Sequence, residues 1–377
     1  MIYKTKLETL PAGYALHDST GLKGESVQVV YREFSCSDDG ELFISRLEGF
    51  PTAILNKIAP SIQPSQVDHL FIVINKDLSC TVYVNEINTF VKIQTTRSVA
   101  AGEEVTNDDI ADIDELKLDG INIPEDSAVV YLFSVQWRKG LFFDFEPISP
   151  NGTPRNYNLS RTLGSFYAFL SNRSVFSLND AQWKILLESD WFPFASLPKD
   201  FVKNLIARTK DSGQLDILIP ELVTAVHDRI PHMLERWVTI PDFAPHIELI
   251  KHATARFLDK DYVSCVAIVF PRIEGILRSV HSSLRLSEKP TQTNLAASVL
   301  QVVGNELQPY SWLLPKQFNQ YLKESYFADF EPGIPARLSR HSIGHGVAEH
   351  ADFNEKHAAI GFLILDQICF LIKRSKK

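Results

Sequence analysis

The spacing of apolar residues changes near residue 150, and no other feature constrains the fold as much. Before that point, short runs of β-branched and aromatic residues are separated by turn-like clusters such as KDLS and RKG. After it, apolar residues recur every three to four positions, as in amphipathic helices. The sequence therefore predicts an α+β protein in which a β-rich antiparallel domain precedes an all-helical part.

The predicted strands follow one another closely. This spacing favours antiparallel hairpins, because parallel crossovers need a dozen or more residues. The runs are SVQVVYREF (26–34), HLFIVIN (69–75), CTVYVNE (80–86), TFVKIQTTRSV (89–99), AVVYLFSVQW (128–137) and LFFDFEPI (141–148). The strongly acidic segment 100–126 is expected to be an exposed excursion.

At 377 residues the chain is too long for one ordinary core. We divide it into a β-rich domain (1–150) that senses a ligand or binds a partner, a helical connector (151–245) and a helical bundle (246–377). Within the helical part, Pro231 is expected to kink or divide a helix, and IPDFAP (240–245) has the character of a linker. The last predicted helix starts with a D-x-x-E capping pattern, from Asp352 to Glu355.

The net charge of −8 argues against a general nucleic-acid coat protein, but the charge is uneven. Residues 1–250 hold 22 Lys and Arg against 34 Asp and Glu, a balance of −12, whereas residues 251–377 hold 16 against 12, a balance of +4. A polyanion should therefore prefer the C-terminal part.

Several features predict a cytoplasmic protein that does not enter a membrane. The first residues lack the apolar core of a secretion signal. The most apolar run, IGFLILDQICFLI, has 13 residues and contains Asp366 and Gln367, which is typical of a core helix. The four cysteines are far apart and form no CxxC pair, so we expect buried thiols in a reducing compartment.

The common nucleotide, dinucleotide, hydrolase and zinc-protease motifs are missing. The sequence contains no GxxxxGK[ST], no GxGxxG after a strand, no GxSxG and no HExxH. We therefore expect no cofactor and no resident metal.

The stretch RHSIGHG, Arg340 to Gly346, places an arginine and two histidines within six positions of a chain that has 11 histidines. In a helix, His341 and His345 would share one face. The glycine at 344 costs a helix about 1 kcal/mol relative to alanine. Its presence predicts that a backbone or a ligand comes close to this turn.

The string Arg340-His341-x-x-x-His345 resembles the signature of the HEPN superfamily, an arginine, a polar residue, three free positions and a histidine. The surroundings are similar as well, since FPRIEGILRSV lies upstream, YLKESYF lies between and an apolar terminal helix follows. The resemblance covers about residues 245–377. It implies a metal-independent endoribonuclease that acts as a toxin or in antiviral defence.

The resemblance also implies roles for individual residues. Arg340 and His345 would be catalytic, with His341 as the supporting polar residue, and RNA would be the substrate. Histidine transfers protons near neutral pH, and arginine binds phosphate oxygens. Glu274 would orient His345 or pair with Arg340; alternatively it forms an i,i+4 surface pair with Arg278. The C-terminal domain would form a homodimer that completes the site, and a trigger ligand or protein would engage the N-terminal domain.

Two other interpretations remain open. His341, His345 and Glu349, with His350 and His357 nearby, could bind zinc or manganese, although a fixed cation at Arg340 opposes this. The bundle could also be a non-catalytic module for dimerisation or for RNA or nucleotide binding.

Overall fold

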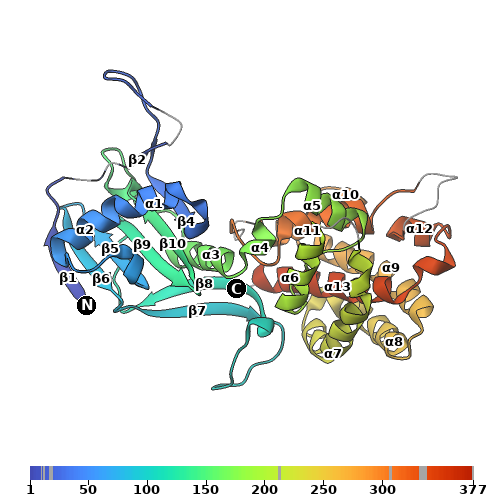
Figure 1. The fold of residues 1–377 in the computed structure, drawn as a ribbon. Coiled ribbons are helices and arrows are strands. Elements are labelled where there is room, and N and C mark those ends of the chain that lie inside the picture. The colour runs from blue at the N-terminus through green and yellow to red at the C-terminus, as the bar shows by residue number, and fades with distance from the viewer. Residues whose placement is uncertain are drawn as a thin grey trace. The chain divides into compact units, whose positions relative to one another are not determined.

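A computed structural model describes residues 1–375 except 10, 12, 17–19, 211–213, 305–307 and 331–337. The chain forms two compact units. The N-terminal unit comprises residues 1–92 and 114–171, and the C-terminal unit comprises residues 93–113 and 172–377. An antiparallel sheet dominates the first unit and helices dominate the second, so the protein has the predicted α+β class (Figure 1).

A six-stranded sheet forms the centre of the N-terminal unit, with strand order β1-β6-β5-β9-β10-β4. Every neighbouring pair is antiparallel. The strands are β1 (Ile2–Lys6), β4 (Arg32–Cys36), β5 (His69–Ile74), β6 (Ser79–Val84), β9 (Ala128–Val135) and β10 (Arg138–Asp144). Two shorter ribbons pair β2 (Tyr14–Ala15) with β3 (Val29–Val30) and β7 (Asn88–Thr95) with β8 (Ile110–Asp119).

Helices cover this sheet because its strands alternate their apolar side chains between the two faces. Phe143 belongs to the core that includes α1 (Glu41–Glu48) and α2 (Phe50–Ile58). Its neighbour Phe142 contacts Phe166 of α3 (Leu159–Ser171), with ring centroids 5.2 Å apart. Phe34 stacks on the same Phe166 ring at 4.1 Å. Helix α3 is thereby fixed against the face that carries Phe142.

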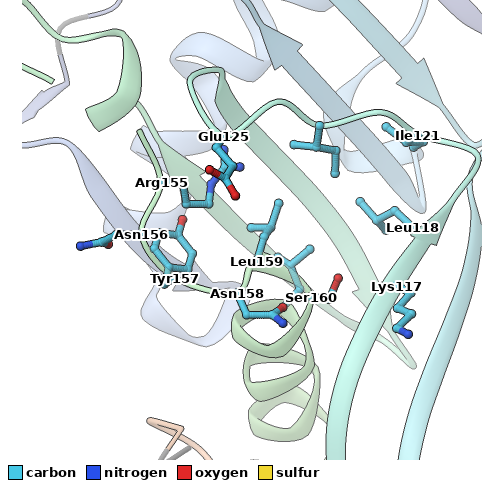
Figure 2. A pocket seen from close by; sticks show the side chains of 12 residues that line it. Lys117, Leu118, Ile121, Glu125, Arg155, Asn156, Tyr157, Asn158, Leu159 and Ser160 are labelled. Atoms are coloured by element: carbon cyan, nitrogen blue, oxygen red, sulfur yellow. The ribbon is translucent and has the colours of Figure 1, made fainter. Parts of the chain in front are cut away.

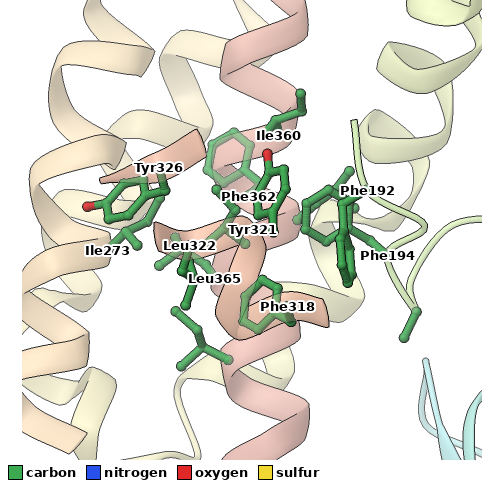
Figure 3. Close-up of a cluster of buried hydrophobic side chains, with 14 of the residues drawn as sticks. Phe192, Phe194, Ile273, Phe318, Tyr321, Leu322, Tyr326, Ile360, Phe362 and Leu365 are labelled. Carbon is green, nitrogen blue, oxygen red and sulfur yellow. The ribbon is translucent and has the colours of Figure 1, made fainter. Parts of the chain in front are cut away.

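The C-terminal unit is built around its last helix, α13 (Glu355–Ser375), which packs against α7, α9 and α10. The unit's other helices are α4 (Arg173–Phe176), α5 (Asp180–Glu188), α6 (Lys199–Arg208), α7 (Ile219–Trp237), α8 (Ile247–Leu258), α9 (Tyr262–Ser283), α10 (Gln292–Val303), α11 (Pro315–Tyr321) and α12 (Arg340–Gly344). Aromatic side chains from α11 and the segment before α6 join the apolar face of α13 in one core (Figure 3).

The two polar residues inside the apolar run of α13 are fully buried and satisfied. Asp366 accepts hydrogen bonds from Arg236 Nη2 to both carboxylate oxygens, each at 2.7 Å, and from the Trp237 indole at 3.1 Å. Ser196 donates a further bond to it. Gln367 accepts from the Ala195 amide at 3.1 Å and donates to the Leu313 carbonyl at 2.6 Å. The run is therefore a core helix, as predicted.

The acidic segment 100–126 is not simply an exposed excursion, and that expectation was wrong for its middle, where residues 109 and 111–116 are buried. Strand β8 begins at Ile110, and Asp112 is fully buried. Its carboxylate accepts from the Ser311 hydroxyl at 2.7 Å and the Trp312 amide at 2.9 Å. Asp109 is held by Arg97 at 2.6 Å. Hydrogen bonds and ion pairs compensate the burial of these carboxylates.

Three further expectations also need correction. The IPDFAP segment forms a 3₁₀ helix (Pro241–His246) with Phe243 buried, so it is not a loose linker. Helix α7 continues through Pro231, so of the two expected outcomes, a kink or a division, the division is excluded. The predicted domain boundaries at residues 150 and 245 do not coincide with the two units. Helix α3 belongs to the N-terminal unit, and α4–α7 share one core with the later helices.

All four cysteines are buried thiols, as expected. Among the described helices, none combines the length and the hydropathy that crossing a membrane requires.

Candidate functional site

The RHSIGHG stretch forms a short helix with well-defined ends. Ser339 caps α12 by accepting the Ser342 amide at 3.1 Å, and the Ser342 hydroxyl accepts the Ser339 amide at 2.9 Å. At the other end, the amides of Gly346 and Val347 bond to the carbonyls of Ile343 and Ser342. This is the Schellman pattern, and Gly346 has the positive φ of 69° that the pattern requires.

Arg340, the first residue of α12, points to the upstream helix α9. Its Nε lies 2.7 Å from Glu274 Oε2, although this ion pair lacks the angle of a hydrogen bond. Glu274 also accepts two bonds from Arg278, at 2.9 and 2.7 Å. Two of the three predicted partners of Glu274, Arg340 and Arg278, therefore contact it together. The described contacts of Glu274 do not include the third, His345.

Gly344 gives the Arg340 side chain its position. A β-carbon on residue 344 would collide with Nη1 of Arg340. The close approach at this turn is thus made by a guanidinium of the same helix, whereas a backbone or a ligand was expected. Arg340 remains 27% exposed while Glu274 is only 12% exposed, so the carboxylate anchors the pair from inside.

The two histidines have different surroundings. His341 is half-buried, with Nδ1 at 3.3 Å from Asp329 Oδ1 and with Nε2 buried and without a hydrogen-bond partner among the described residues. His345 is exposed and follows the last residue of α12. Its ring lies 5.5 Å from the Phe330 ring and 6.2 Å from the His341 ring. His345 is therefore the imidazole that an external molecule can reach.

Three residues of this neighbourhood were not predicted from the sequence. Asp329 and Phe330 contact the two histidines, as described above. Tyr326 donates its hydroxyl to the Phe270 carbonyl of α9 at 2.6 Å and lies near Glu274 and Arg340. Burial raises the pKa of Tyr326 well above its ordinary value, so this hydroxyl stays a protonated donor. The spacing of apolar residues in and after YLKESYF does not predict these contacts.

The metal interpretation finds no ligand set in the described part of the chain. No group of three or more His, Cys, Asp or Glu side chains is placed there to hold an ion. His357, one of the proposed ligands, instead contacts the Asp352 carbonyl through Nδ1 at 2.7 Å.

Comparisons with family models, with curated proteins and with solved structures find no match for this chain.

Proposed function

We propose that this chain is a metal-independent endoribonuclease of the HEPN type, active in the cytoplasm as a toxin or in antiviral defence. The observation that supports this best is the placement of Arg340 and His345 at the two ends of one short helix, with His345 exposed. An arginine and an accessible imidazole are the groups that phosphodiester cleavage without metal requires.

In the proposed reaction, the ribose 2′-oxygen attacks the adjacent phosphorus while the bond from phosphorus to the 5′-oxygen breaks. The 2′-hydroxyl loses its proton to a base, and the leaving 5′-oxygen gains a proton from an acid. His345 performs one of these transfers. Arg340 neutralises the charge on the phosphoryl oxygens, and Glu274 positions its guanidinium. The products are a 2′,3′-cyclic phosphate and a 5′-hydroxyl.

A second copy of the chain would supply the other proton carrier. Within one copy, His341 directs Nδ1 towards Asp329 and buries Nε2, which suits a positioning residue better than an acid or base. A two-fold dimer would place two copies of His345 and Arg340 in one cleft. Mixing Arg340→Ala and His345→Ala chains should then restore partial activity. A monomer that cleaves at full rate would contradict the shared site.

One observation favours the alternative of a non-catalytic RNA-binding or dimerisation module. Arg340 already pairs with Glu274, which reduces the charge that it offers to phosphate. The two functions make different predictions, because a binding module retains RNA without cutting it.

Expression of the intact chain in bacteria distinguishes them. We expect growth arrest and RNA fragmentation from the wild type, and neither from Arg340→Ala or His345→Ala. Two exposed residues of the same unit provide matched controls, His350→Ala and Arg256→Ala. Both should be as toxic as the wild type. Equal toxicity and equal RNA profiles from all five chains would exclude the nuclease function.

A further inference from the structure

The N-terminal unit contains a cavity of about 780 Å³. Its walls come from the end of β8 and the loop after it, and from the segment 155–160 that leads into α3 (Figure 2). Leu118, Ile121 and Ile123 are among its apolar lining residues, and Asn156 and Ser160 are among its polar ones. This volume lies within the usual range of small-molecule sites, about 300–1,000 Å³.

The N-terminus of α3 opens into this cavity. Asn158 caps the helix, since its side chain accepts the Arg161 amide at 3.1 Å and its carbonyl accepts the Thr162 amide at 3.1 Å. The amides of Leu159 and Ser160, both lining residues, have no acceptor among the described residues. A helix of 13 residues concentrates partial positive charge at such free amides.

Arg155 adds a buried cation to the same wall. Its side chain is only 4% exposed, and Nη2 donates to the Ser127 carbonyl at 2.8 Å. Nε makes no hydrogen bond and lies 3.7 Å from Asp144. Asp144 has further partners, because it accepts a hydrogen bond from the Tyr157 hydroxyl at 2.6 Å and forms an ion pair with Arg32 at 3.3 Å. Two guanidiniums on one carboxylate leave a positive excess.

The rim of the cavity shows the same imbalance. Lys117 contacts Glu115 at 3.3 Å, but Glu115 also faces Lys92 at 3.4 Å and Arg161 at 3.9 Å. Glu125 is the one carboxylate among the residues that line the cavity. Two cations, Lys117 and Arg155, thus line the cavity against one carboxylate, Glu125, in the more acidic part of the chain.

We propose that this cavity binds a phosphate monoester of about nucleotide size. The phosphate would accept hydrogen bonds from the free amides of α3, close to Arg155 and Lys117. Its organic part would lie on the aliphatic wall and bond to Asn156, because the volume is far larger than an inorganic ion needs. This inference does not depend on the proposed nuclease activity.

Titration calorimetry on the full-length chain tests the proposal, with AMP, adenosine and inorganic phosphate as probes. AMP should bind about tenfold or more tightly than adenosine, and its affinity should fall as salt increases. Phosphate should compete with AMP.

Two substitutions locate the site without disturbing the buried Arg155. Ser160→Asp places a negative charge at the second position of α3, which favours the helix but repels a phosphate. It should weaken AMP binding about tenfold or more and leave the melting temperature unchanged or raised. Lys117→Met should weaken AMP binding by about threefold or more. Thr293→Asp, at the second position of α10 in the other unit, is the matched control and should bind AMP normally.

Three results would overturn the proposal. The first is no binding of AMP or phosphate at concentrations up to about 5 mM. The second is equal binding of AMP and adenosine, which would remove the role of the phosphate. The third is undiminished AMP binding by Ser160→Asp, which would place the ligand elsewhere.

Discussion

The buried ion pair between Arg236 and Asp366 should be the most sensitive point in the C-terminal unit. Asp366 is fully buried and Arg236 is 9% exposed, and the pair joins α7 to the central helix α13. Asp366→Ala removes the carboxylate that two Arg236 bonds, the Trp237 indole and Ser196 share. The guanidinium would be left as an uncompensated buried charge.

Breaking such a pair costs about 3–5 kcal/mol. For a unit of this size, each kcal/mol lowers the melting temperature by about 2–4 °C, so Asp366→Ala should lower it by about 6–20 °C. The double variant Arg236→Met/Asp366→Ala should recover part of the loss, because it removes the uncompensated charge and Met has a volume similar to that of Arg. We expect a coupling free energy of about 2 kcal/mol or more between the two sites.

Urea unfolding followed by tryptophan fluorescence measures these effects. Four of the five tryptophans, Trp183, Trp191, Trp237 and Trp312, lie in the C-terminal unit, so its transition dominates the signal. Asp259→Ala is the matched control. It breaks an ion pair with Arg256 that is nearly as short, at 2.9 Å, but has side chains 46% and 60% exposed. It should change stability by less than about 1 kcal/mol. If Asp366→Ala and this control had the same free energy of unfolding, the reasoning would be refuted.

Three smaller perturbations have equally definite outcomes. The Arg97 hydrogen bond lowers the pKa of Asp109 to about 2, so the stabilising contribution of this carboxylate is present above its unfolded pKa of about 3.9 and is lost as the pH falls towards 2. In Asp109→Asn, the urea midpoint should therefore change less with pH between about 4 and 2 than it does in the wild type. The same pH dependence in both chains would contradict this. Ser339→Ala should cost α12 about 1 kcal/mol and reduce RNA cleavage while Ser339→Asp retains it, and equal cleavage by both would show that the cap does not support the site. Tyr326→Phe should lower the free energy of unfolding by about 1 kcal/mol, measured in urea, because the bond to the Phe270 carbonyl is lost; no change would mean that this buried bond contributes nothing net.

Periodicity predicted the elements whose stability comes from their own apolar face. Strands β5, β6 and β9 lie close to their predicted ranges, and the last helix, α13, follows the predicted capping segment Asp352 to Glu355. The cap of α13 differs in detail. Asn354, not Asp352, accepts the His357 amide at 3.1 Å, because Asp352 is used in the preceding turn by the Glu349 amide. Two side chains able to cap compete here, and local spacing does not decide between them.

The elements that were missed depend on partners far away in the sequence. The acidic sequence of strand β8 predicts an exposed segment. In the structure Asp112 is buried because Ser311 and Trp312, about two hundred residues later, donate hydrogen bonds to it. Helices α1 and α2 lie within the predicted β-rich domain and were not predicted as helices. Both are short, and each buries only two or three side chains.

The candidate site was predictable only where its residues follow one another. Arg340, His341 and His345 form a local motif, which the structure holds in and directly after one short helix, α12. Glu274 was the candidate named from another part of the chain, by its place in the upstream helix, and it contacts Arg340. The contacts of Asp329 and Phe330 with the two histidines come from the path of the chain between α11 and α12, which no local period encodes.

The most direct measurement is cleavage of single-stranded RNA by the purified full-length chain in EDTA, with analysis of the new ends. The account predicts 2′,3′-cyclic phosphate and 5′-hydroxyl ends, formed by the wild type and by the His350→Ala control but not by Arg340→Ala or His345→Ala. Intact RNA with the wild type, 3′-hydroxyl and 5′-phosphate ends, or equal cleavage by all four chains would contradict it.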